Sequence, residues 1–258
     1  MNFFILVKRI KTYYNYIEGD NLDKIKELQD IIDNSNNIVF FGGAGVSTES
    51  GLKDFRSENG LYKEKLSKPA EYYLSSDCFY DEPEEFFKYY KENMNFLSAK
   101  PNITHLYLTK LEESGKLKAI ITQNIDGLHQ KANSKNVLEI HGTIYKNHCL
   151  KCNKEYPAEY IFNAKGIPKC KCGGTIKPDV VLYGEMLPDD YSKAVKYIYE
   201  AETLIVAGTS LTVEPASSLL RVFRGKNLVI INHGLTPYDN IATLSIRDNL
   251  KNVISKLK

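Results

Sequence analysis

The sequence lacks a long apolar segment, a strong excess of charge of either sign and a recognisable targeting signal. No stretch approaches a membrane span, which takes roughly 20 apolar residues. The N-terminal apolar run 3–7 is short and precedes the basic residues, whereas a secretory signal has the opposite order. The net charge of +2 is too small to indicate a nucleic acid or an anionic membrane as the main partner. We therefore expect a cytoplasmic protein with no direct contact to nucleic acid or membrane.

The chain also lacks both familiar phosphate-binding glycine motifs, although it has a glycine-rich turn. The turn 43–45 follows the apolar run 38–41, but the third glycine of G-x-G-x-x-G is missing. No Gly-Lys-Ser/Thr follows, which excludes the Walker pattern. The small residues still let backbone N–H groups approach a pyrophosphate, and Ser47 and Thr48 add hydroxyls. A tight turn without a ligand fits this motif equally well.

No internal repeat or low-complexity linker divides the 258 residues, which suffice for one large α/β domain with insertions. Apolar runs predict strands at 38–41, 119–121, 137–140, 180–182, 204–207 and 228–231. Helical spacing predicts helices at 22–32, 102–114, 189–202 and 214–224. Continuous apolar strands separated by helices indicate a parallel sheet covered on both faces. The Tyr/Phe/Glu-rich stretch 57–100 and the cysteine-bearing stretch 145–178 interrupt this pattern, and we interpret both as insertions.

Polar residues follow the predicted strand 119–121, in the sequence TQNIDGLHQ at 122–130. The carboxyl ends of parallel strands line the crevice in which α/β proteins bind ligands. Gln, Asn and Asp side chains together can hydrogen-bond ribose hydroxyls and a carboxamide. The alternative is a helix N-cap formed by Asn124 or Asp126.

His141 follows another apolar run, 137–140, at the same expected edge of the sheet. Histidine is the natural general base near neutral pH, whereas a lone histidine is more often structural. Its position favours catalysis for His141, and we expect His129 to pack near the site without being the base. The structural role is expected for His105, His148 and His233. Polar residues typical of contacts to the adenosine half of a dinucleotide follow the last two strands, namely Gly208, Thr209, Ser210 and Asn232.

Four of the five cysteines cluster as C-x-x-C and C-x-C, and only Cys78 stands alone. In a cytosolic chain this clustering favours a metal over disulfides, and two such knuckles are typical of structural zinc. The expected ligands are Cys149, Cys152, Cys170 and Cys172. The shortened second knuckle is expected to cost backbone N–H···S geometry, with His148 as the substitute ligand if the set is incomplete. Four thiolates leave zinc no open position for catalysis.

Together these elements resemble the sirtuin family of NAD-dependent protein deacylases. The matching stretches occur in the family's order over about residues 22–258, and they are 43–62, 122–130, 139–143, the cysteine pairs, 177–188, 208–211 and the turn at 231–232. The resemblance implies a Rossmann-like NAD-binding domain and a smaller domain, with the active site between them. The large domain would comprise 21–56, 101–144 and 179–258. The helical insertion 57–100 and the zinc insertion 145–178 would form the small domain, and 1–20 would be an N-terminal extension.

The resemblance implies that NAD is a consumed co-substrate and that one zinc is structural. The implied cofactor-binding residues are Gly43, Ala44, Gly45, Thr48, Phe55, Arg56, Gln123, Ile125, Asp126, Gly208, Thr209, Ser210, Asn232 and Asp248. His141 would be the general base, and Asn124 would order the ribose and nearby water. An acyl-lysine protein substrate would add as an extended strand beside Val181, Leu182 and Tyr183. The products would be free lysine, nicotinamide and O-acyl-ADP-ribose.

The choice of acyl group follows from one departure within the family. Desuccinylating members carry a Tyr-x-x-Arg pair in the helical insertion, whereas the matching positions here are Phe87 and Tyr90. Without a guanidinium an acidic acyl group would be desolvated and unpaired. We therefore predict acetyl or longer apolar acyl groups over succinyl.

Other functions remain open alternatives at the level of sequence. A mono-ADP-ribosyltransferase would use NAD with a different acceptor, and a non-catalytic NAD or ADP-ribose sensor would not need the base at His141. A zinc-ribbon nucleic-acid binder is disfavoured by the near-neutral charge. A dehydrogenase is disfavoured by the missing third glycine. We expect the protein to be a monomer.

Overall fold

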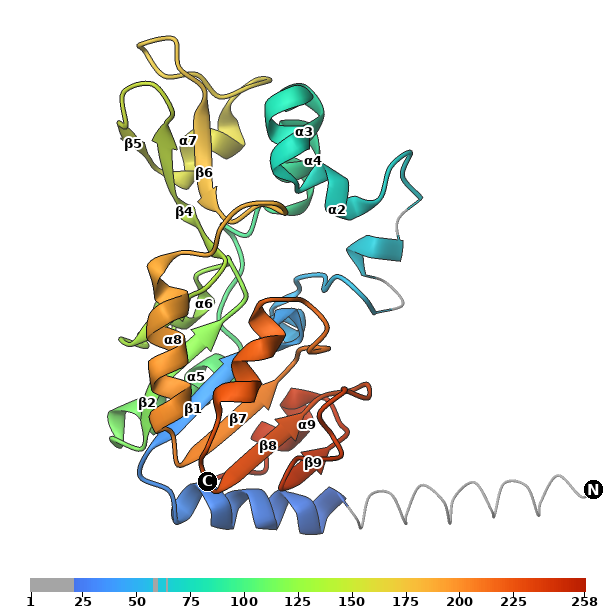
Figure 1. The fold of residues 1–258 in the computed structure, drawn as a ribbon, viewed down its shortest axis with the longest axis vertical. Helices are drawn as coiled ribbons and strands as arrows, with labels where there is room; N and C mark the ends of the chain where they lie inside the picture. The colour runs from blue at the N-terminus through green and yellow to red at the C-terminus, as the bar shows by residue number, and fades with distance from the viewer. Residues whose placement is uncertain (1–20, 58–59, 64) are drawn as a thin grey trace, which may run out of the picture.

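The computed structural model describes residues 21–57, 60–63 and 65–258 (Figure 1). The predicted N-terminal extension 1–20 lies outside the described residues. A six-stranded parallel sheet forms the larger part, in the order β3-β2-β1-β7-β8-β9. Its strands are β1 (Ile38–Gly42), β2 (Leu117–Thr122), β3 (Val137–Glu139), β7 (Thr203–Ala207), β8 (Asn227–Ile231) and β9 (Leu244–Ile246). The predicted α/β class with a parallel sheet is confirmed.

Helices cover both faces of this sheet because consecutive strand residues are apolar. Phe40 packs on the face covered by the helical residues 21–33 and by α5 and α9. Phe41 packs on the opposite face, against α8 and the 3-10 helix η4. The covering elements are α5 (Ile103–Glu113), α8 (Asp189–Glu200), η4 (Ala216–Val222) and α9 (Leu250–Ile254). The chain thus buries a two-faced core and leaves the strand ends to carry polar residues.

Three details of the sequence prediction differ from the structure. The run 180–182 is not a strand of the parallel sheet, because β6 (Ile176–Val180) pairs antiparallel with β4 and the chain leaves it at Val181. The predicted helix 214–224 is the 3-10 helix η4. The short edge strand β9 carries no clear apolar run and is absent from the prediction.

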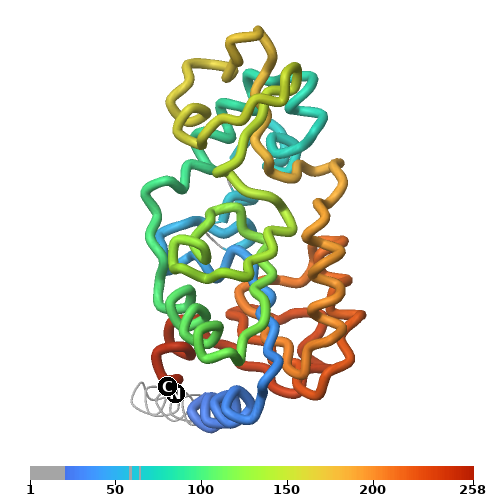
Figure 2. Tube along the Cα trace, turned by 90° about the vertical axis from the view of Figure 1, so that its left-hand side faces the viewer, coloured from blue at the N-terminus to red at the C-terminus, as the bar shows by residue number. Residues whose placement is uncertain are grey.

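The two insertions lie together at one end of the molecule, beyond the carboxyl ends of the large sheet (Figures 1 and 2). A small antiparallel sheet has the order β5-β4-β6, and buried residues of both insertions share one core. Elements of this part are α2 (Ala70–Tyr73), α3 (Ser76–Asp81), α4 (Pro83–Asn93), β4 (Gly142–Cys149), β5 (Glu155–Tyr156) and α7 (Ala158–Asn163). The exact domain boundaries stay a prediction.

Candidate active site

The glycine turn after β1 packs directly on the turn after β7. Gly45 N–H donates to the carbonyl of Gly208 at 2.8 Å. A Cβ on Gly43 would lie 2.7 Å from Cβ of Thr209, and one on Gly45 would lie 2.7 Å from Cα of Gly208. Glycine is therefore required here for the close packing of the two turns. This agrees with the alternative in which the motif is a tight turn that needs no ligand. They also bring two loops together where strand order reverses beside β1, which is the usual ligand crevice of such sheets.

Asp126 is held by two hydrogen bonds in a buried polar cluster. Its side chain is 3% exposed. Ser47 Oγ donates to Oδ2 at 2.6 Å, and Leu128 N–H donates to Oδ1 at 2.9 Å. Leu128 begins α6 (Leu128–Lys131), whose N-cap is Gly127, so the alternative that Asn124 or Asp126 is the N-cap is wrong, although one oxygen of Asp126 accepts from the first helical N–H. Burial raises the pKa of Asp126, and the bonds from Ser47 and Leu128 oppose that rise.

Ser47 is the central residue that sequence reasoning undervalues. From sequence it is expected only as a hydroxyl donor to a phosphate. In the structure Ser47 is buried, donates to Asp126 and accepts from Asn124 Nδ2 at 3.1 Å. It therefore connects the loop after β1 to the loop after β2. No local pattern reveals this contact, because its partners lie 77 and 79 positions away.

His141 has a defined tautomer. Its Nδ1 lies 3.0 Å from the backbone oxygen of Gln123. A carbonyl oxygen only accepts, so Nδ1 must carry the proton and the lone pair is left on Nε2. Burial lowers the pKa of His141, and the hydrogen bond to Gln123 partly opposes this. The imidazole is therefore neutral near pH 7, and its basic nitrogen makes no hydrogen bond to the part of the chain that the structure describes.

Gln123 links three strand ends. Its N–H donates to the carbonyl of Gly42 at 2.9 Å, and its Nε2 donates to Thr209 Oγ1 at 3.1 Å. Its carbonyl meanwhile holds His141. The predicted residues after β1, β2, β3 and β7 are thus brought to one edge of the sheet.

The other predicted cofactor residues of the strand ends make short-range contacts. The Thr48 hydroxyl donates to the backbone three residues earlier at 3.1 Å. Ser210 Oγ lies 2.9 Å from the hydroxyl of Thr212, and Asn232 Nδ2 donates to the carbonyl of Gly234 at 3.0 Å. These bonds shape the loops after β1, β7 and β8.

Asp248 is not joined to the polar cluster by any contact among the described residues. Its carboxylate accepts from Asn249 N–H at 2.7 Å and from Asn252 Nδ2 at 2.8 Å. These bonds organise the start of α9. A cofactor-binding role for Asp248 therefore stays a prediction.

Phe55 and Arg56 lie on the loop after η2 (Thr48–Ser50), and both contact Tyr62. Ile125 packs at the rim of the core that the insertions share, and its carbonyl accepts from Ile144 N–H at 3.1 Å. These residues thus connect the polar cluster to the smaller part of the molecule.

The segment 181–183, which we call the substrate segment, begins beside His141. Val181 N–H donates to the carbonyl of His141 at 2.9 Å. Tyr183 N–H donates to the carbonyl of Leu74 at 3.0 Å, and its carbonyl accepts from Ser76 N–H at 2.9 Å. One edge of the segment is therefore paired with His141, Leu74 and Ser76, and on the other edge the N–H and the carbonyl of Leu182 are both bonded to Glu185.

A buried ion pair stabilises the turn after the substrate segment. Glu185 Oε2 accepts from Lys177 Nζ at 3.0 Å and from Leu182 N–H at 2.9 Å. Lys177 is 8% exposed, and its Nζ also donates to the carbonyls of Pro178 and Val180. The contact fixes the segment relative to β6.

The four predicted cysteines converge. Their sulfur atoms all lie within 4.8 Å of one another, and two pairs, Cys149–Cys172 and Cys152–Cys170, are 3.5 and 3.6 Å apart. A tetrahedral zinc with bonds of about 2.3 Å requires sulfur atoms about 3.8 Å apart. The arrangement fits one structural zinc, and no disulfide joins these thiols.

The C-x-C knuckle keeps some backbone support for its sulfur atoms, and its expected geometric cost stays a prediction. Cys172 N–H donates to the sulfur of Cys170 at 3.5 Å, so a backbone N–H···S bond is kept. Gly174 makes room for the knuckle, because a Cβ there would lie 2.6 Å from the sulfur of Cys149. His148 instead contacts the carboxylate of Asp179 through Nδ1. A substitute ligand is not needed.

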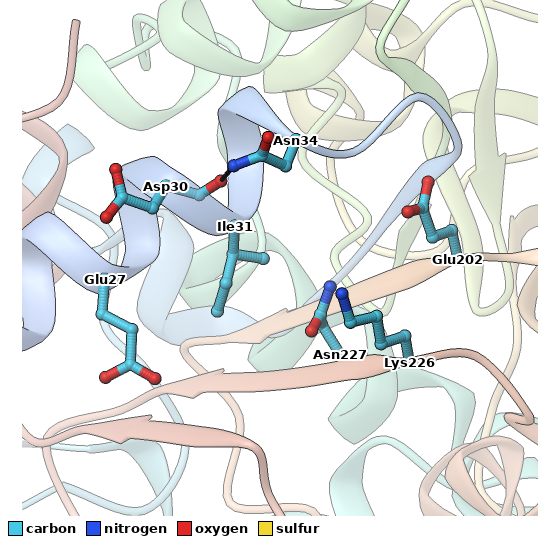
Figure 3. A pocket seen from close by; sticks show the side chains of 7 residues that line it. All are labelled: Glu27, Asp30, Ile31, Asn34, Glu202, Lys226 and Asn227. Carbon is cyan, nitrogen blue, oxygen red and sulfur yellow. Dashed lines mark hydrogen bonds between the residues drawn. The ribbon is translucent and has the colours of Figure 1, made fainter.

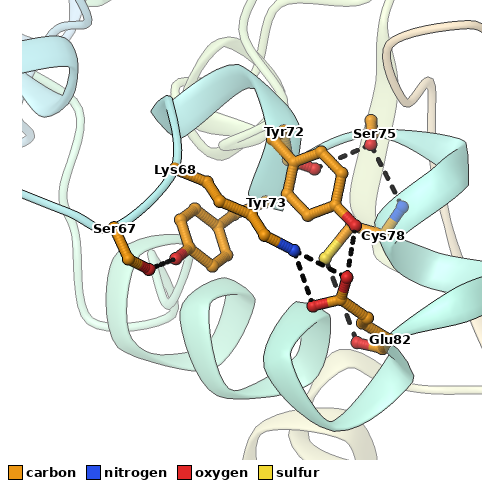
Figure 4. Close-up of polar contacts among 7 residues, drawn as sticks. All are labelled: Ser67, Lys68, Tyr72, Tyr73, Ser75, Cys78 and Glu82. Atoms are coloured by element: carbon orange, nitrogen blue, oxygen red, sulfur yellow. Dashed lines mark hydrogen bonds and ion pairs between the residues drawn. The ribbon is translucent and has the colours of Figure 1, made fainter.

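The fifth cysteine, Cys78, is buried in the helical insertion (Figure 4). Burial raises the pKa of its thiol to about 11. Nearby, Glu82 accepts from Lys68 Nζ at 2.6 Å and from the Tyr72 hydroxyl at 2.7 Å. A protonated, buried thiol of this kind is unreactive, so the cluster serves packing.

A cavity of about 320 Å³ lies far from these residues, at the amino ends of β7 and β8 (Figure 3). Its lining consists of Glu27, Asp30, Ile31, Asn34, Glu202, Lys226 and Asn227. The predicted site residues lie at the opposite ends of the strands. This cavity is therefore separate from the candidate site.

His129 packs as expected, in a buried pair with His105. The two ring centroids lie 4.7 Å apart, and both side chains are at most 1% exposed. Burial lowers the pKa of His129 well below its ordinary value and that of His105 to about 4. Neither ring reaches the polar cluster through a hydrogen bond among the described residues.

Comparison with known proteins connects this arrangement to one family. The sequence model of the Sir2 family matches residues 43–215. The chain is similar to an NAD-dependent protein deacetylase of Clostridium acetobutylicum, with 56% identity over 90% of this chain and 97% of the relative. Two solved structures are 40% identical over 90% of this chain and 96% of theirs. One is a Sir2 variant with a deacetylated p53 peptide and 3′-O-acetyl-ADP-ribose (TM-score 0.84), and the other is Sir2 with a p53 peptide and NAD+ (TM-score 0.81).

Proposed function

The chain belongs to the Sir2 family, and from this membership we propose that it removes acetyl groups from protein lysine side chains in an NAD-dependent reaction. The observation that carries the proposal is the fixed tautomer of His141 at the sheet edge that also presents Asn124 and Asp126. A protein that only binds NAD has no need of a free basic nitrogen there. The similar solved structures with NAD+ and with 3′-O-acetyl-ADP-ribose support the same reaction.

NAD fits the candidate site through its phosphates and its nicotinamide ribose. The loops at Gly43–Gly45 and Gly208 approach closely at the switch point, where open α/β sheets bind their ligands, and the pyrophosphate would lie there. Asp126 and Ile125 would bind the carboxamide, with the carboxylate oriented by Ser47. NAD supplies the ribose carbon that accepts the acyl oxygen as nicotinamide leaves.

His141 would accept the proton in the step that follows. Its Nε2 carries the lone pair, so the imidazole would act as the general base for a ribose hydroxyl placed beside it. Asn124, held by Ser47, would orient that ribose. Phe55 would keep water away from the reacting carbon.

An extended peptide with an acylated lysine is the proposed protein substrate. It would lie beside the substrate segment and compete with Glu185 for the backbone groups of Leu182, and this segment is hydrogen-bonded to His141 through Val181. This places the acyl group near the base. A similar structure contains Sir2Tm with a propionylated peptide, at 39% identity to this chain.

The cellular location and the oligomeric state of the protein are also proposals. Among the described residues no helix combines the length and apolarity that a membrane span requires. We propose a cytoplasmic monomer that acts on proteins, and size-exclusion chromatography with light scattering tests the oligomeric state.

Incubation of the purified protein with an acetyl-lysine peptide tests the function. With NAD present, mass spectrometry is expected to show loss of the acetyl group together with nicotinamide and O-acetyl-ADP-ribose. Without NAD the peptide is expected to stay intact. Consumption of NAD with an intact acetyl group contradicts deacetylation and favours mono-ADP-ribosyl transfer. Binding of NAD without any consumption favours a sensor.

Acetyl peptides are expected to react more efficiently than succinyl peptides by about tenfold or more, because a charged acyl group would lose hydrogen bonds in the site. Phe87 and Tyr90 are fully buried in the core that the insertions share, and 57–100 contains no arginine. The measurement is kcat/KM for matched acetyl and succinyl peptides of one sequence. A higher kcat/KM for the succinyl peptide contradicts the prediction.

A further inference from the structure

The chain folds back onto the loop that carries Phe55. Leu61 N–H donates to the carbonyl of Asp54 and Tyr62 N–H to that of Phe55, both at 2.9 Å. Gly60 approaches so closely that a Cβ there would lie 2.6 Å from the Phe55 carbonyl carbon. Tyr62 and Phe55 therefore form one local unit, and whatever fixes Tyr62 also fixes Phe55.

The ring of Tyr62 contacts both side chains predicted to hold NAD from this loop. Its centroid lies 5.4 Å from that of Phe55, and the guanidinium carbon of Arg56 lies 5.1 Å from it. That distance is within the range of cation–π attraction. Burial and the contact with Tyr183 raise the pKa of Tyr62, so its hydroxyl keeps its proton.

This hydroxyl contacts the hydroxyl of Tyr183 in the substrate segment, 121 positions along the chain. Tyr183 is 40% exposed, so its hydroxyl is not held there by core packing. Its backbone, in contrast, is fixed on both sides by Leu74 and Ser76. The hydroxyl pair thus connects the cofactor loop to a segment that is itself anchored to the helical insertion.

We propose that the pair Tyr62–Tyr183 is a positioning device that holds Phe55 and Arg56 against the substrate segment. This inference rests on the proposed function, because it assigns the loop to NAD and the segment to the peptide. In this scheme only the contact between the two hydroxyls connects the NAD loop to the substrate segment. A single remaining hydroxyl therefore does not position the loop. The pair therefore sets the affinity for NAD through the placement of Phe55 and Arg56.

Four variants test the pair: Y62F, Y183F, Y62F/Y183F and the control Y199F. Tyr199 lies near the end of α8 and is 62% exposed. Phenylalanine keeps each ring and removes only the hydroxyl. Each single variant is expected to raise KM and the calorimetric Kd for NAD about three- to tenfold, the size of one hydrogen bond. The double variant is expected to match the single variants, because both remove the same contact. Y199F is expected to behave as wild type.

Calorimetric titration with NAD in the absence of peptide keeps this test separate from the proposed function. A wild-type protein that binds NAD but does not deacetylate the peptide overturns the proposed function. In that case the NAD affinities of the variants still show whether the Tyr62–Tyr183 contact positions the NAD loop. Single variants with wild-type affinity for NAD, or strictly additive losses in the double variant, overturn the positioning device. Thermal unfolding of every variant checks that the fold is kept. A wild type that does not bind NAD overturns both proposals.

Discussion

The variant His141→Ala is expected to lose deacetylation by about 10²- to 10⁴-fold in kcat, the usual contribution of a general base. The reason is geometric, because Gln123 fixes the proton on Nδ1 and leaves Nε2 as the basic atom. Alanine removes that atom without adding a polar group. Steady-state kinetics with an acetyl-lysine peptide and saturating NAD measure the loss.

Binding of NAD provides the control for this variant. His141 acts after NAD is bound, so the calorimetric affinity of His141→Ala for NAD is expected to stay within a few-fold of wild type. Thermal unfolding of the variant excludes a general loss of structure. A variant with more than a tenth of wild-type kcat would contradict the role of base.

The pH dependence of the wild type tests the same residue independently. Burial lowers the pKa of His141 from its ordinary value of 6.5, so the imidazole stays basic at pH values where an exposed histidine is already protonated. As the pH falls through the lowered pKa, kcat/KM is expected to decrease. The acid limb should therefore lie below pH 6.5, and an acid limb above it is the contrary result.

Much of this site is predictable because strand ends carry it. The apolar runs place the strands of the sheet, and parallel pairing brings their carboxyl ends to one edge. The residues Gln123, Asn124, Asp126 and His141 follow from that rule alone. What they bind does not follow from it, and the resemblance to a family supplies that part.

The rest depends on contacts that no local pattern encodes. Ser47 forms hydrogen bonds with Asn124 and Asp126, which lie in the loop after β2. Tyr62 contacts Tyr183 across a long sequence separation, and this contact requires the helical insertion to be packed. The error at 180–182 has a similar cause. A continuous apolar run is compatible with a parallel strand and equally with a chain passing from the small sheet into the substrate segment.

Removal of zinc is expected to abolish activity although the metal lies outside the candidate site. Cys149 and Cys170 are 1% and 6% exposed and belong to the core that the two insertions share. The site joins the end of β4 to the loop before β6, and β6 leads directly to the substrate segment. Structural zinc contributes about 10–16 kcal/mol in small zinc domains, which exceeds the stability of most domains. Loss of zinc should therefore unfold this part and release the substrate segment.

Metal analysis is expected to give one zinc per chain in the wild type and none in Cys170→Ser. That variant, or the wild type after treatment with a chelator, should lose deacetylation and show a lower temperature of unfolding. Cys78→Ala is the matched control, because Cys78 is buried in the same core but is not among the four converging thiols. It should keep its zinc even where the lost sulfur costs some stability. If zinc-free protein retained activity, the metal would not hold the substrate segment in place, and the rigidity of that segment would have to come from Lys177, Glu185 and the helical insertion alone.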